Sequence, residues 1–184
     1  FWEDHIYLTA MADGSDYALC LDEHGKESWK TKIGKGREGS HRQGTGANPS
    51  AVVNESGLIV YFKSGNLAKL SHSGEVIWKT NLQEKYEKDI LWWDLGTSPV
   101  LAGDLVIVAV MQQENKSYII ALHQESGKVV WKRDRNLDAP VESNDAYTTP
   151  IVAEVDGQKQ LVIFGADQLT GHSLENGQMI WQCK

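Results

Sequence analysis

The chain has 184 residues and a formal net charge of −7, and its 41% hydrophobic and 23% charged residues are ordinary for a folded globular domain. The negative charge argues against nucleic acid as a partner, because phosphate backbones are bound by basic patches. No apolar run approaches the roughly 20 residues of a membrane-spanning helix, so we expect no transmembrane segment.

The predicted elements are short strands, because the apolar runs are brief, rich in β-branched and aromatic residues, and bounded by polar turns. Three strands begin near a proline, which lacks an N–H and suits the first residue of a strand: Pro49, Pro99 and Pro150. In chain order, the predicted strands are 6–11, 17–21, 48–53, 58–62, 66–70, 98–102, 105–110, 118–122, 149–153, 161–164 and, with the weakest pattern, 169–172.

Four tryptophans follow these strands at near-constant spacing, and each comes four positions after a glycine. The spacings between them are 49, 53 and 50 residues. A repeat of about 40 to 50 residues built from short strands is typical of propellers. The glycine precedes the last strand of each unit, where a hairpin favours a positive φ angle. The pairs are Gly25 and Trp29, Gly74 and Trp78, Gly127 and Trp131, and Gly177 and Trp181.

These patterns predict an all-β fold, a β-propeller of four-stranded antiparallel blades in which the tryptophans pack between blades. The repeat units are about 1–34, 35–83, 84–134 and 135–184. We expect the first blade to be incomplete, because the chain opens at Phe1-Trp2 like the end of a first strand. The chain is therefore expected to be part of a larger, eight-bladed ring, whose open blade edges would favour self-association.

The unit of strand, polar turn and Gly-x-x-x-Trp resembles the tryptophan-docking motif of PQQ-like β-propeller repeats, most fully over 121–131. That family includes the quinoprotein alcohol dehydrogenases, typically with eight blades, and the non-enzymatic periplasmic lipoprotein BamB. The resemblance implies a bacterial cell-envelope protein, periplasmic or secreted. It is specific for the fold and not for an activity, because the motif concerns packing.

Candidate binding residues lie in the long connections that follow the tryptophan strands, since function often resides on loops held by a rigid scaffold. Counting back from each proline aligns Gln43-Gly44, Trp93-Asp94 and Asn144-Asp145 near the predicted mouth of the central channel. Asp94 and Asp145 fall in register, which makes them candidates for a polar site. The alternative is that each aspartate accepts hydrogen bonds from nearby turn N–H groups.

Two loop segments allow both a structural and a functional interpretation. The charged stretch 83–89 predicts a short helical turn, and the adjacent Trp92-Trp93 pair would suit sugar stacking or a protein partner if exposed. More often, such a pair is tucked under its own loop. The stretch 34–46 combines glycines with Arg37, His41 and Arg42 and could surround an anion, but its glycines precede a strand, which favours a flexible loop.

The sequence predicts a protein without enzymatic activity, cofactor or metal ion. Quinoprotein dehydrogenases hold PQQ against a disulfide of adjacent cysteines, whereas Cys20 and Cys183 lie in separate repeat units. Calcium takes six to eight oxygen ligands, more than Glu142 and its neighbours Asn144 and Asp145 supply. We therefore expect a non-catalytic module that binds a protein or polysaccharide partner. The alternative is half of a PQQ-dependent dehydrogenase. The candidate binding residues are Trp92, Trp93, Asp94, Asn144 and Asp145.

Overall fold

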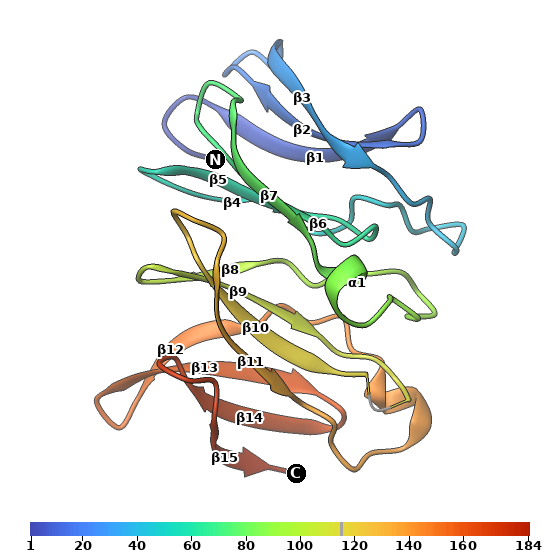
Figure 1. Cartoon of the computed structure of the whole chain (residues 1–184), viewed down its shortest axis with the longest axis vertical. Helices are drawn as coiled ribbons and strands as arrows, with labels where there is room; N and C mark the ends of the chain where they lie inside the picture. The colour runs from blue at the N-terminus through green and yellow to red at the C-terminus, as the bar shows by residue number, and fades with distance from the viewer. Residues whose placement is uncertain (115) are drawn as a thin grey trace. The chain divides into compact units, whose positions relative to one another are not determined.

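The computed structural model describes residues 1–114 and 116–184. The chain divides into two compact units, Phe1–Leu95 and Gly96–Lys184, which are described separately. Both units consist of short antiparallel strands joined by turns and loops (Figure 1). The all-β prediction is confirmed.

The first unit contains a three-stranded sheet followed by a four-stranded sheet, and each strand pairs with the next one along the chain. The first sheet consists of β1 (Ile6–Ala12), β2 (Ser15–Leu21) and β3 (Glu27–Lys35). The second consists of β4 (Val52–Asn54), β5 (Gly57–Tyr61), β6 (Asn66–Leu70) and β7 (Val76–Asn81). The four-residue helix α1 (Leu82–Lys85) follows β7, and the Asn81 side chain caps it by accepting hydrogen bonds from two of its N–H groups.

The second unit contains two four-stranded sheets with the same sequential pairing. The first consists of β8 (Val100–Ala102), β9 (Leu105–Val110), β10 (Tyr118–His123) and β11 (Val129–Asp134). The 3-10 helix η1 (Val141–Asn144) precedes the second sheet, which consists of β12 (Ile151–Val155), β13 (Gln158–Gly165), β14 (Gln168–Ser173) and β15 (Met179–Cys183). The predicted propeller blades, with an incomplete first blade, are confirmed, and β14 is the strand with the weakest sequence pattern.

The register around the repeat tryptophans is the same in all four sheets. Each tryptophan on the last strand pairs with a residue of the strand before it, and the register shifts immediately afterwards. The preceding glycines all have positive φ angles, which glycine adopts without steric cost. The residues opposite the tryptophans are Cys20, Lys69, Ala121 and Gly171.

Within each unit, a tryptophan of one sheet packs on the repeat glycine of the next. The Trp29 indole donates a hydrogen bond to the His72 carbonyl oxygen at 2.9 Å, and a Cβ on Gly74 would lie 2.7 Å from its ring. Only glycine leaves room for this approach. The second unit repeats the contact with Trp131, Leu174 and Gly177, where the indole hydrogen bond is also 2.9 Å.

Candidate functional site

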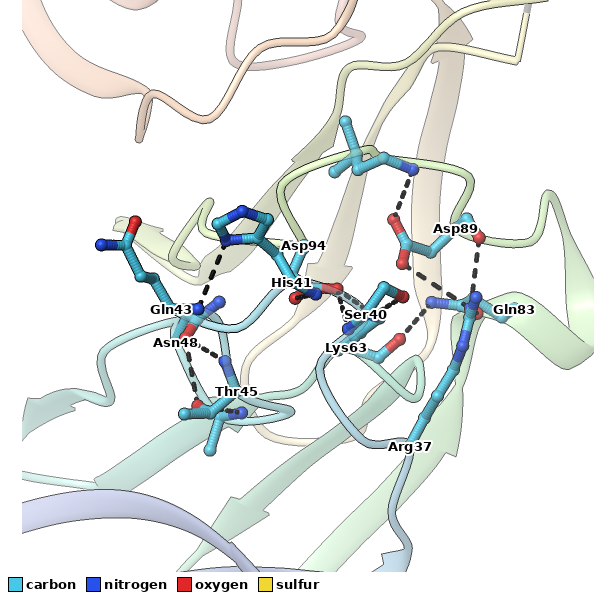
Figure 2. Close-up of polar contacts among 12 residues, drawn as sticks. Arg37, Ser40, His41, Gln43, Thr45, Asn48, Lys63, Gln83, Asp89 and Asp94 are labelled. Carbon is cyan, nitrogen blue, oxygen red and sulfur yellow. Dashed lines mark hydrogen bonds and ion pairs between the residues drawn. The ribbon is translucent and has the colours of Figure 1, made fainter.

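Two long loops meet in the first unit and form a cluster of polar contacts (Figure 2). One loop joins β3 to β4, and the other follows α1 and contains Asp94. Asp94 accepts hydrogen bonds from the backbone N–H groups of Ser40 at 2.8 Å and His41 at 3.0 Å. Its carboxylate also pairs with the ammonium group of Lys63, which follows β5, and both side chains are fully buried. Three segments far apart in sequence are thereby joined at one carboxylate.

The glycines of the first loop allow the backbone to approach this carboxylate closely. A Cβ on Gly44 would lie 2.3 Å from Asp94 Oδ2, and one on Gly39 would lie 3.1 Å from it. The glycine-rich stretch therefore does surround an anion, and the anion is the side chain of Asp94. A loop fixed in this way differs from the flexible loop that the sequence favoured.

A second, looser pair lies at the edge of the same loops. Arg37 Nη1 donates to the Asp89 carbonyl oxygen at 3.2 Å and lies 3.6 Å from Asp89 Oδ2, which accepts no hydrogen bond. Asp89 is buried, whereas nearly half of the Arg37 side chain is exposed. The two residues border a cleft of about 800 Å³, which Lys35, Gln83 and Ile90 also line. The cleft offers an exposed cation and a buried, unsatisfied acceptor to a ligand.

The pKa values of Asp89 and Asp94 are shifted in opposite directions. Burial raises the pKa of Asp89, and the hydrogen bond from the Leu91 N–H and the charge of Arg37 only partly offset it. Burial also acts to raise the pKa of Asp94, but the hydrogen bonds from Lys63, His41 and Ser40 outweigh it, so the pKa is lowered.

We expect the two aspartates to give opposite pH dependences of stability. Between about pH 3.8 and the raised pKa, Asp89 of the wild type is ionised in the unfolded state but protonated in the folded state, so the wild type loses stability as pH rises. Asp89→Asn has no such loss and should therefore gain stability relative to the wild type over this range. Asp94→Asn should instead cost stability above about 3.8 and lose that cost as pH falls through the lowered pKa. Urea unfolding between about pH 3 and 7 measures both differences. Parallel curves for the two variants would contradict the assignment.

The aromatic pair lies on the outside of the second loop. Trp92 is 71% exposed and Trp93 is 50% exposed. The Trp93 ring contacts the His41 ring edge-on, with 4.3 Å between centroids. The interpretation that the pair is tucked under its own loop is therefore wrong. The loop instead buries Leu91 and Leu95, on either side of the pair.

The second unit holds the remaining two candidates in different surroundings. Asp145 accepts hydrogen bonds from the Gln113 backbone N–H at 3.1 Å and from its side-chain amide at 3.0 Å. Asn144 lies at the end of η1 and donates to the Ala139 carbonyl oxygen at 3.3 Å. The structure thus brings Trp92, Trp93 and Asp94 together in the first unit, while Asn144 and Asp145 belong to the other unit.

The described part of the chain contains no cluster of three or more histidine, cysteine, aspartate or glutamate side chains that could hold a metal ion. Both cysteines are free, with Cys20 buried in the first unit and Cys183 exposed in the second. The adjacent cysteines that hold PQQ in quinoprotein dehydrogenases have no counterpart in the pair Cys20 and Cys183. Among the described helices, none has the length and apolarity needed to cross a membrane.

The site also contains residues that no sequence pattern indicated, namely Ser40, Lys63 and Asp89. Lys63 follows the apolar run 58–62, and a fully buried lysine at such a position requires a partner. A lysine directly after an apolar strand could therefore have indicated a buried ion pair. Its partner Asp94 lies 31 residues away, and no local sequence pattern identifies it.

Comparison with known proteins identifies the family. The sequence profile of the family described as outer membrane protein assembly factor BamB matches residues 14–184. No curated protein sequence matches the chain.

Solved structures share the fold at low sequence identity. BamB from Moraxella catarrhalis is 17% identical with a TM-score of 0.57, and the match covers 97% of this chain and 50% of that one. Quinohemoprotein alcohol dehydrogenase from Comamonas testosteroni is 13% identical with a TM-score of 0.60, covering 99% and 37%. The quinohemoprotein alcohol dehydrogenase ADHIIG from Pseudomonas putida HK5 is 11% identical with a TM-score of 0.59, covering 96% and 33%.

The chain thus spans between a third and a half of the length of these structures. The structural likeness, at such identities, concerns the fold. The family profile covers nearly the whole chain, together with the four-fold repeat of glycine and tryptophan. The chain therefore belongs to the family of the outer membrane protein assembly factor BamB, within the PQQ-like β-propellers.

Proposed function

We propose that this chain is a non-catalytic binding module of the bacterial cell envelope, which engages a protein partner through the loop surface of its first unit. The observation that carries the proposal is the exposure of Trp92 and Trp93 on a loop that a buried ion pair holds in place. Tryptophans on preorganised loops are frequent centres of protein interfaces, because they bury a large area at little cost in side-chain entropy. The family description, an outer membrane assembly factor, supports a protein partner and a periplasmic location.

The surface around the pair has the mixed character of a protein interface. Ile90 adds an exposed apolar side chain beside the tryptophans, and Arg37 adds an exposed cation at the mouth of the cleft. An apolar centre with polar groups at its rim is the usual anatomy of a transient interface. The candidate residues Asn144 and Asp145 lie in the second unit and are not part of the surface proposed here.

The test uses a photo-crosslinking amino acid at position 92 in cells that express the protein in the periplasm. We expect a discrete crosslinked protein at position 92 that Trp93→Ala weakens. His24 supplies the control position, because it lies in the exposed turn between β2 and β3, away from the loops. Equal crosslinking at positions 24 and 92, or none at 92, would contradict the proposal.

The stability of the tryptophan variants makes this test interpretable. Because Trp92 is largely exposed, Trp92→Ala is expected to change the free energy of unfolding by no more than about 0.5 kcal/mol.

A polysaccharide partner is the competing possibility, since exposed tryptophans also stack on sugars. Protease-resistant, glycosidase-sensitive adducts at position 92 would favour that partner.

The likeness to quinohemoprotein alcohol dehydrogenases makes half of a PQQ-dependent dehydrogenase the second candidate. Against this candidate, Cys20 and Cys183 lie in separate units, and the described residues hold no metal-binding cluster of histidine, cysteine, aspartate or glutamate. We expect no micromolar binding of PQQ with calcium in a calorimetric titration. Tight binding that Asp145→Ala abolishes would favour the dehydrogenase.

A further inference from the structure

At one interface between neighbouring sheets, polar residues occupy three positions that are apolar at the equivalent interface. The repeat tryptophans define equivalent positions, and four residues after them the chain has Ile33, Leu82 and Arg135, all buried. On the strand before the tryptophan strand, the two residues flanking the one opposite the tryptophan are apolar in the first three repeats and polar in the fourth. These pairs are Leu19 and Leu21, Ala68 and Leu70, Ile120 and Leu122, and then Thr170 and His172.

The same three positions meet in both units. In the first unit, Ile33, Ala68 and Leu70 belong to one apolar cluster between the sheets. In the second unit, Arg135 Nε and Nη2 donate to Thr170 Oγ1 at 3.2 and 3.0 Å, and His172 Nε2 lies 3.0 Å from the same oxygen. The three departures from the repeat thus form a single hydrogen-bonded network, which is not the pattern of scattered, independent substitutions.

The network carries a positive charge that the described residues do not neutralise. Arg135 is 97% buried, and its other acceptors are the carbonyl oxygens of Gly165 at 3.3 Å and Ile163 at 3.4 Å. Among the described residues, the hydrogen-bond acceptor of its Nη1 is the sulfur of Met111, at 3.5 Å. No carboxylate of the described chain lies within ion-pair distance of this guanidinium. Burial lowers the pKa of Arg135 to about 10, so the group stays charged at neutral pH.

A cavity of about 320 Å³ lies beside this network within the second unit. Arg135 and His172 line it, and so do Arg133 near the end of β11 and Asp134, whose carboxylate pairs with Lys132 at 2.8 Å. Asn136 and Gln178 add polar groups to the lining. Burying an uncompensated cation is costly, whereas a bound anion would remove that cost. Guanidinium groups also match the geometry of phosphate and carboxylate oxygens.

We propose that this cavity, lined by Arg133, Arg135 and His172, binds a small oxyanion such as phosphate or sulfate. The site lies in the second unit and is independent of the loop surface proposed above for a protein partner. The bound anion neutralises the buried guanidinium and links β11 to β14 and its turn. The shared chemistry is that of a tetrahedral oxyanion, either free or as the phosphoryl group of a larger molecule.

Thermal unfolding in buffers of matched ionic strength tests the proposal, with sodium chloride as the reference and inorganic phosphate as the probe. A ligand at 100 times its dissociation constant lowers the unfolding equilibrium constant about 100-fold, so the Tm should rise by several degrees with phosphate. Titration of the line width of phosphate in ³¹P NMR measures the affinity directly. A wild-type chain with no response beyond that to chloride in both measurements would overturn the proposal.

The repeat supplies the variant that should lose the site and keep the fold. Arg135→Leu, Thr170→Ala and His172→Leu together restore the residues found at the equivalent interface positions, and buried charges replaced by apolar residues often leave stability equal or higher. We expect this triple variant to melt at or above the wild-type Tm without phosphate and to show no phosphate response. An undiminished response in the triple variant would overturn the proposal.

A single substitution provides a second test that does not depend on repacking the core. Arg133→Ala is expected to weaken phosphate binding about tenfold, whereas Lys159→Ala, which removes an exposed cation of β13 in the same unit, should leave it unchanged. Equal effects of the two variants would show that phosphate responds to surface charge alone and would contradict the proposal. Binding of glycerol 3-phosphate with similar affinity would identify a phosphoryl group as the ligand, and binding of inorganic phosphate only would identify the free anion.

Discussion

Replacing Asp94 with alanine is expected to lower the free energy of unfolding by about 3–5 kcal/mol, because it leaves the ammonium group of Lys63 buried without a counter-charge. The variant also removes the acceptor of two backbone N–H groups, those of Ser40 and His41. Buried donors left unsatisfied add to the penalty. Chemical denaturation of the whole chain measures the loss.

A double-mutant cycle measures the interaction free energy between Lys63 and Asp94. Lys63→Met alone leaves a buried carboxylate, and Asp94→Asn alone leaves a buried ammonium group, so each should be strongly destabilising. The combination of Lys63→Met with Asp94→Asn removes both charges, and asparagine tolerates the positive φ of 72° at position 94. The double variant should therefore be more stable than the sum of the single losses implies. Losses that add within about 0.5 kcal/mol would contradict a coupled pair.

The loop surface is joined to the core of the first unit by this pair. Asp94 follows Trp92 and Trp93 directly, so its buried carboxylate holds the segment that presents them. If the protein partner binds the tryptophans, the pair acts on affinity as a positioning element. Asp94→Asn should then weaken partner binding. The double variant Lys63→Met with Asp94→Asn should recover binding to the extent that it recovers stability.

The sequence predicted the fold well because the repeat is a local pattern. Glycine, tryptophan and short apolar runs recur with one spacing, and each strand pairs with the next one along the chain, so no long-range information is needed. Even the weakest pattern, at 169–172, lies within β14. The loops follow no such rule, since their contacts join residues 31 to 54 positions apart.

The exposure of Trp92 and Trp93 shows why the loop surface could not be predicted. A loop of this length needs only a few apolar anchors, and Leu91 and Leu95 take those positions. With Asp94 buried by its ion pair, the tryptophans are directed outward. Counting back from the prolines did align Gly44 with Asp94, and these two residues are in close contact in the structure.

Arg135 is a different case, because the sequence does contain its signal. Aligning the repeats on their tryptophans places arginine in the third repeat where the first two have isoleucine and leucine. A charged residue at a repeat position that is otherwise apolar indicates a departure from pure packing. Its partners Thr170 and His172 become recognisable only once the register of β14 and β15 is known.

Replacing Trp131 with alanine is expected to destabilise the protein by about 3–5 kcal/mol, as for other large buried aromatic residues. Trp131 is 94% buried and packs between the two sheets of the second unit with Ile107 and Leu161. Truncation removes these contacts and also leaves the Leu174 carbonyl oxygen without its indole donor. Urea denaturation compares this variant with Trp92→Ala, whose loss should be far smaller. Equal losses at the two positions would contradict the packing role of Trp131.

Gly177, which lies under the Trp131 indole, provides the converse test. A methyl group added there should displace the ring and so disturb the same contact that Trp131→Ala removes. A Cβ at Gly177 would lie 2.6 Å from the Trp131 ring, and the residue has a φ of 72°. Gly25 has a similar φ of 77° but no atom within 4 Å of the added Cβ. Gly25→Ala should therefore cost only the conformational strain, about 1–2 kcal/mol, whereas Gly177→Ala should cost clearly more because the indole must move. Equal losses for the two alanine variants would mean that the glycine is required for its backbone angle alone and not for the contact between the sheets.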